Sequence, residues 1–151
     1  MRSPNSAIRR QSGFTLIELT VVVMVMGVLL AYAAPLFQKA FEQSRVDLAA
    51  ANLESVWTAE RLYWAQNRTF ATSVGDLESS GLLDPSFLNS MSSPSAAFSY
   101  AIGAADATTF SAAATRVNSG HWSGQLSITE QGTLSGQIDG TPSEVIIPSR
   151  T

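Results

Sequence analysis

A single apolar stretch near the start of the chain constrains the fold more than any other feature. Residues 14–37 contain one charged side chain, Glu18. The leader before this stretch contains no acid and three basic residues: Arg2, Arg9 and Arg10. A segment of this length and polarity can cross a bilayer as a helix. A carboxylate at the centre of such a helix costs about 2.5 to 3.5 kcal/mol, so an acid within the segment indicates a function and a partner, even near the helix start.

One interpretation of this stretch is a secretory signal peptide that is removed after export. The basic leader, an apolar core at residues 19–30 and the small-x-small triplet Ala31-Tyr32-Ala33 are the parts of such a signal. The chain would then be a secreted binding domain that begins at Ala34. Glu18 argues against this interpretation, because a removable signal has no use for a carboxylate at the start of its core. The apolar run also continues beyond the triplet into a helical pattern.

The other interpretation rests on the residues that join the leader to the apolar stretch. They resemble the class III signal of bacterial type IV pilins and type II secretion pseudopilins: Gly13-Phe14-Thr15-Leu16-Ile17-Glu18-Leu19. The resemblance implies that prepilin peptidase cuts after Gly13 and N-methylates Phe14. It also implies that Glu18 pairs with the terminal amine of a neighbouring subunit in a filament. Removal of one partner from a buried ion pair is strongly destabilising, so such pairing is physically reasonable.

Two helix-weakening residues lie inside the apolar stretch. Pro35 removes the backbone hydrogen bond to the carbonyl of Ala31, and Gly27 weakens a helix by about 1 kcal/mol relative to alanine. Membrane helices tolerate both residues as simple kinks. The resemblance implies a second role, in which the helix between them unwinds in the assembled filament and makes the filament extensible.

The resemblance also implies partners and a location. The partners are further copies of this chain in a helical filament, the prepilin peptidase and N-methyltransferase, and an inner-membrane assembly platform with its ATPase. The basic leader favours the cytoplasmic side, which puts the chain after Phe37 outside the cytoplasm. The expected location is therefore the bacterial inner membrane for the precursor, then an extracellular or periplasmic filament.

A helical pattern continues beyond the apolar stretch, over residues 38–66. Apolar side chains recur there at three- and four-residue spacings together with one acid: Phe41, Val46, Ala49, Leu53, Val56, Trp57, Glu60 and Tyr63. Most charged residues fall between them: Glu42, Arg45, Asp47, Glu54 and Arg61. The pattern predicts one helix over residues 15–66, of which Leu53, Val56, Trp57 and Tyr63 pack under a sheet.

The remaining residues predict a loop followed by an antiparallel sheet. Residues 67–97 resemble the pilin αβ loop, with a short helical turn at residues 74–83 that Gly81 ends before Asp84-Pro85. Short segments rich in β-formers follow, separated by turn residues: residues 98–102, 110–116, 125–129 and 134–138, with 145–147 as a fifth, edge strand. Glu130-Gln131-Gly132 is expected to close a hairpin. The fold class is α+β, with a long helix spine packed on a small antiparallel sheet of about four strands.

Several function classes have no support in the sequence. The chain has no cysteine and a single histidine, His121, expected in a turn, so Cys-His chemistry is excluded and no metal site or cofactor is predicted. Asp139-Gly140 is interpreted as a turn, without the successive acids of a calcium loop. Without the leader the chain has six basic and twelve acidic residues, a formal net charge of −6. Nucleic-acid binding requires a basic surface, so no nucleic acid is expected as a partner.

The sequence therefore predicts a filament subunit with five parts. They are a leader at 1–13, a transmembrane and assembly helix at 14–37, an amphipathic helix at 38–66, an αβ loop at 67–97 and a sheet domain at 98–151. A minor pilin or a type II secretion pseudopilin is the alternative within the same class, and the secreted binding domain is the alternative from another class. No enzymatic activity is expected.

Overall fold

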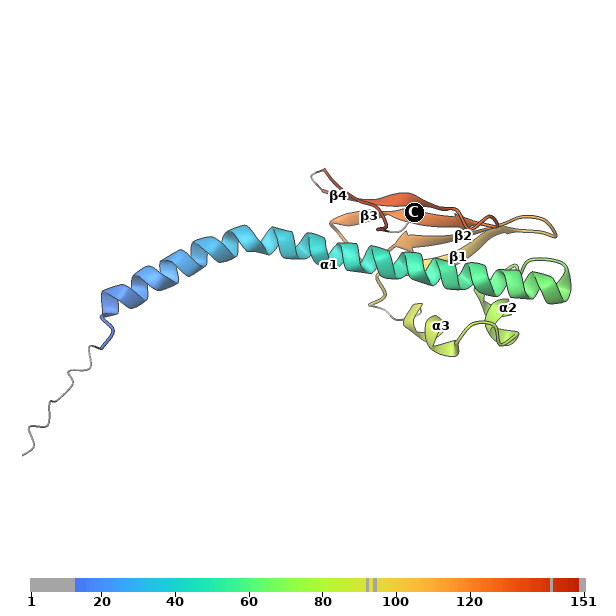
Figure 1. Cartoon of the computed structure of the whole chain (residues 1–151), viewed down its shortest axis with the longest axis horizontal. Coiled ribbons are helices and arrows are strands. Elements are labelled where there is room, and N and C mark those ends of the chain that lie inside the picture. The colour runs from blue at the N-terminus through green and yellow to red at the C-terminus, as the bar shows by residue number, and fades with distance from the viewer. Residues whose placement is uncertain (1–12, 92, 94, 142, 150–151) are drawn as a thin grey trace, which may run out of the picture. The chain divides into compact units, whose positions relative to one another are not determined.

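The computed structural model describes residues 13–91, 93, 95–141 and 143–149, so leader residues 1–12 lie outside the described range. The chain divides into two compact units, residues 1–39 and 40–151. Helix α1, Leu16–Asn67, extends through the boundary between them (Figure 1). The prediction of one helix over residues 15–66 is therefore confirmed to within one residue at each end.

The second unit contains a five-stranded antiparallel sheet. Its strands are β1 Phe98–Ala105, β2 Phe110–Arg116, β3 Trp122–Thr129, β4 Leu134–Gly140 and β5 Glu144–Ile146. They pair in sequence order, so the sheet is a simple meander with β1 and β5 at its edges. In Figure 1 the strands run beside the second half of α1. The α+β class, the fifth edge strand and the hairpin between β3 and β4 are confirmed.

The core lies between one face of α1 and the inner face of the sheet. In β2 buried residues alternate with more exposed ones, as expected for a strand with one covered face. The buried side chains of α1 recur at three- and four-residue intervals: Glu42, Val46, Ala49, Ala50, Leu53, Val56, Ala59 and Glu60. Leu53 and Val56 are core residues, and Trp57 and Tyr63 are half-buried against the core, as predicted.

Phe41 shares the helical spacing of the apolar residues but was not among those expected to pack under the sheet, and 68% of this residue is exposed. The buried face of α1 begins at Glu42, and adjacent helix residues point about 100° apart. The aromatic side chain is therefore turned away from the sheet. Glu42, which the sequence placed among the residues between the apolar positions, occupies the buried position.

The αβ loop contains two short helices, where the sequence predicted one. Helix α2, Val74–Ser79, is capped by the Ser73 side chain, and Gly81 follows it with a left-handed φ of 70°. Helix α3, Pro85–Met91, was not predicted. Asp84 caps it, since its carboxylate accepts a hydrogen bond of 2.7 Å from the Ser86 N–H. Proline is favoured at the first helical position, so Asp84-Pro85 begins a helix here. Both helices lie against β1.

Two further expectations at strand ends are wrong. Trp122, placed between strands by the sequence, begins β3, and Asp139-Gly140, interpreted as a turn, lies in β4. Trp122 pairs with Gly140 across the two strands. The tryptophan ring lies so close to Gly140 that a β-carbon there would overlap it. Gly140 therefore serves close packing within the sheet, and the chain turns immediately after it.

Candidate functional site

The first candidate site is the start of α1, where Thr15 and Glu18 bind each other. The Thr15 N–H and hydroxyl donate hydrogen bonds of 3.1 and 2.9 Å to Oε2 of Glu18. In return the Glu18 N–H donates to the Thr15 hydroxyl oxygen at 3.3 Å. This reciprocal arrangement is a capping box, which satisfies backbone N–H groups at a helix start. The sequence contained its signal, Thr15 followed three residues later by Glu18, and the interpretation of Glu18 as an assembly residue left this local role out.

The apolar stretch is exposed along the part that the structure describes. Every large apolar side chain from Phe14 to Phe37 is at least 48% exposed. By length and composition, α1 can cross a membrane. Soluble monomers rarely expose so large an apolar surface, and a surface of this kind marks a contact with lipid or protein.

Gly27 and Pro35 both lie within α1, and the helix continues through them. A β-carbon on Gly27 would meet no atom within 4 Å. Glycine is therefore not required there by packing within this unit. This leaves two uses for the position, close approach of another helix or local weakening of α1.

In the second unit, a buried ion pair joins α1 to β2. The guanidinium of Arg116 contacts Oε1 of Glu42 through Nε, and its Nη2 donates to Oε2 at 3.0 Å. The two side chains are 3% and 1% exposed. Arg116 also donates to the carbonyls of Ala97 and Val117, and the more exposed Arg45 adds a contact of 3.1 Å to Glu42. No local pattern predicts this pair, because its members lie 74 residues apart.

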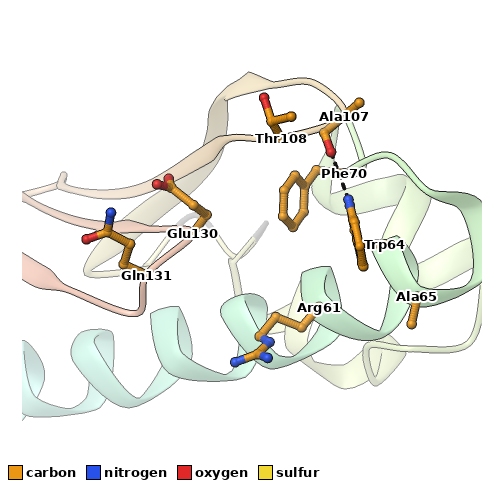
Figure 2. A pocket seen from close by; sticks show the side chains of 8 residues that line it. All are labelled: Arg61, Trp64, Ala65, Phe70, Ala107, Thr108, Glu130 and Gln131. Carbon is orange, nitrogen blue, oxygen red and sulfur yellow. Dashed lines mark hydrogen bonds between the residues drawn. The ribbon is translucent and has the colours of Figure 1, made fainter.

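Two tryptophans of α1 fix two turns of the sheet. Trp57 Nε1 donates to the Glu130 carbonyl at 3.0 Å, and Trp64 Nε1 donates to the Ala107 carbonyl at 2.8 Å. Between the turns lies an open hollow of about 600 Å³ (Figure 2). Phe70 and Trp64 form its aromatic wall, and its polar lining includes Arg61, Thr108, Glu130 and Gln131. The hollow can admit a ring-sized group beside polar partners.

The C-terminal segment is held on α1 by Asp47 and Gln43. The Ser149 N–H and hydroxyl donate to the Asp47 carboxylate at 2.9 and 3.0 Å. Gln43 Nε2 donates to the Ile147 carbonyl at 3.0 Å and to the Asp47 carboxylate at the same distance. In a chain without cysteine, these hydrogen bonds are a noncovalent attachment of the last described residues to the helix.

The remaining candidates lie at exposed positions. His121 sits in a bend before β3, as expected for a turn residue, and its Nδ1 is 3.4 Å from the Thr141 hydroxyl. Within the described ranges no group of three or more histidine and acidic residues could hold a metal ion. Asp139 lies next to Gln137, whose amide donates to its carboxylate at 2.8 Å.

Comparisons with known proteins agree with the signal at the start of α1. The family model described as "Prokaryotic N-terminal methylation motif" matches residues 8–34. The type IV major pilin protein PilA of Myxococcus xanthus is 38% identical over 69 residues, which cover 44% of this chain and 31% of the relative. The type II secretion system core protein G of Pseudomonas aeruginosa is 34% identical over 70 residues, which cover 46% of this chain and 49% of the relative.

The chain thus spans about a third of one relative and about half of the other. The methylation motif, both relatives and the α+β architecture support the assignment of the chain to the type IV pilin and pseudopilin family. Its N-terminal part fits a membrane-anchored precursor of this family.

Proposed function

We propose that this chain is the structural subunit of a type IV pilus-like filament. In this proposal the precursor sits in the inner membrane, prepilin peptidase cuts after Gly13, and the new terminus at Phe14 is N-methylated. The mature subunits then polymerise through residues 14–37. The observation that carries the proposal is the exposed apolar start of α1 within a methylation motif.

The apolar side chains of residues 14–37 would exchange lipid contacts for protein contacts during assembly. In the bilayer, lipid covers them, and in a filament the same side chains of neighbouring subunits cover each other. Lipid tails are as apolar as leucine, so this exchange depends on close packing and on polar contacts between helices. Small residues favour close packing, which suits Gly27 for a helix contact. Pro35 and Gly27 remain the places at which α1 would unwind under tension.

Glu18 supplies the polar contact in this proposal. Both of its hydrogen bonds from Thr15 go to Oε2. The terminal amine of a neighbouring Phe14 would add a charged partner to the same carboxylate. A charge moved from the helix start into a bundle of apolar helices requires such a partner. The capping box holds the carboxylate at a fixed place on the helix, which would set the axial position of the neighbour.

A pseudopilin of type II secretion is the second candidate, because the core protein G match covers the larger share of its relative.

Electron microscopy of cells with and without the gene tests the first candidate. We expect surface filaments that bind antibody against residues 40–151 in cells with the gene, and none in cells without it. The pilus proposal would be contradicted if cells with and without the gene carried the same filaments and the antibody labelled neither. Loss of exported proteins without loss of filaments would favour the pseudopilin.

A further inference from the structure

Glu60 is a fully buried acid at the place where the αβ loop meets α1. Its exposed fraction is 0%. One carboxylate oxygen, Oε2, accepts a hydrogen bond of 2.9 Å from the Ala71 N–H. The other, Oε1, is buried and has no hydrogen-bond partner among the described residues. A buried charge without full hydrogen bonding is costly, so this carboxyl group is more stable in its neutral form.

The charged groups around Glu60 do not offset this cost. Asp76 on α2 is the charged group that acts on it, and its effect is repulsive. On α1 and in the loop, the cations Arg61 and Arg68 lie over tryptophan rings at 5.0 and 5.4 Å. On the turn between β1 and β2, the Asp106 carboxylate accepts hydrogen bonds from its own turn. The ion pairs found in the described part of the chain do not include Glu60.

The titration of Glu60 agrees with this geometry. Burial raises the pKa of Glu60 from 4.5 to about 7, the hydrogen bond from Ala71 opposes the rise, and the charge of Asp76 adds to it. An acid whose pKa is raised by folding stabilises the folded contact below its usual pKa. That stabilisation is lost as the pH rises through the raised value. The contact between the loop and α1 is therefore weakened between about pH 5 and pH 7 and stays weak above it.

The loop has few other polar attachments at this point. The Phe70 N–H donates to the Asp106 carbonyl at 3.0 Å, which ties the loop to the sheet. Phe70 and Ala71 are buried against the core. The bond from Ala71 to Glu60 ties this buried backbone to the α1 side chains. An ionised carboxylate would accept this bond more strongly, but it would also place an unpaired charge in a buried site, and opening of the loop relieves that larger cost.

We propose that Glu60 is a pH-sensitive latch, which holds residues 68–73 on α1 while its carboxyl group is neutral and releases them when it ionises. This inference goes beyond the filament proposal and does not depend on it, because it concerns a single chain. Release would expose Phe70 and change the surface of the αβ loop at its junction with the hollow of Figure 2.

Limited proteolysis of the full-length protein in detergent tests the latch. Proteinase K would be used from pH 6 to pH 8, and cleavage within residues 68–73 would be measured by mass spectrometry. Each rate is divided by that of Glu60→Gln at the same pH, which cancels the pH dependence of the protease. If Glu60 has its ordinary pKa of 4.5 when the loop is open, linkage predicts that this ratio rises about tenfold between pH 6 and pH 8. The control Glu54→Gln, a less buried acid of α1, should behave as the wild type.

A ratio that stays constant from pH 6 to pH 8 would overturn the latch. If Glu60→Gln does not fold, a synthetic peptide of residues 66–75 replaces it as the reference for protease activity. The wild-type rate relative to that peptide should then show the same tenfold rise. A flat profile in this second comparison also contradicts the proposal.

Discussion

Glu42→Ala is expected to lower the free energy of unfolding by about 3 to 5 kcal/mol, because it leaves a buried guanidinium without its carboxylate. The side chain of Arg116, the last residue of β2, is buried against α1, and its Nη2 donates to Glu42 at 3.0 Å. Two carbonyl contacts would remain, but neither carries a full negative charge. The measurement is denaturant unfolding of the full-length protein in detergent, followed by tryptophan fluorescence.

Two further variants show whether the charge or the side-chain volume matters. Glu54→Ala removes a less buried acid from the same helix and should change stability by no more than about 0.5 kcal/mol. The double variant Glu42→Leu with Arg116→Leu removes both charges and should recover most of the loss, since an apolar pair can replace a buried ion pair. If Glu42→Ala is as stable as Glu54→Ala, the buried pair does not hold the helix on the sheet.

Glu18→Ala is expected to abolish filament assembly and to leave cleavage after Gly13 intact. Without the carboxylate, the amine of the neighbouring subunit would be buried without its partner. Removal of one partner from a buried pair is strongly destabilising, and in the proposed filament this cost recurs at every subunit. We expect the yield of sheared filaments to fall by more than about nine-tenths, while immunoblots of membranes show the mature subunit at its normal level.

The capping box provides the matched controls for this experiment. Thr15→Ala removes the hydroxyl that Glu18 binds but keeps the carboxylate. Glu18→Gln keeps an oxygen for the cap but removes the charge. If Glu18 acts through charge pairing, Thr15→Ala retains most filaments and Glu18→Gln loses them. The reverse order would show that Glu18 serves only to begin α1, and normal yield from Glu18→Ala would remove it from assembly altogether.

The sequence predicted those elements whose residues follow a local pattern. The α1 helix and strand β2 were located to within a residue because hydrophobic spacing fixes both their period and their ends. The meander followed from short turns between strands. The start of α3 was also locally encoded, but Asp84-Pro85 was placed only after the helical turn at residues 74–83. In the structure Asp84 is a cap and Pro85 is the first helical residue.

Features that depend on distant residues were not predictable in this way. Glu42 belongs to the buried face of α1 only because Arg116 meets it from β2. A polar residue next to Phe41 gives no local sign of such a partner, so Glu42 was placed among the charged residues between the apolar positions. Glu60 fitted the buried spacing of α1, but the loop backbone that makes its burial possible lies eleven residues further along the chain.

The residues of the candidate assembly site were predicted from the sequence, but their local hydrogen bonds were not. Its residues, Gly13, Phe14 and Glu18, were recognisable because they lie in one short stretch, residues 13–18. The capping box lies in the same stretch, yet the resemblance to a signal directed attention to Glu18 as a partner for another chain. The structure adds that Glu18 already has a partner in its own chain, Thr15, which caps the helix. The two roles are compatible, because a carboxylate accepts several hydrogen bonds.

Mass spectrometry of the mature N-terminus tests the central claim most directly. The protein would be purified from the membranes and the filaments of the cells that make it, and its N-terminal peptide would be sequenced by fragmentation. The filament-subunit proposal predicts a chain that begins at Phe14 and carries one methyl group on the terminal nitrogen. A chain that begins at Ala34, after removal of an ordinary signal peptide, or one that retains residues 1–13 would contradict it.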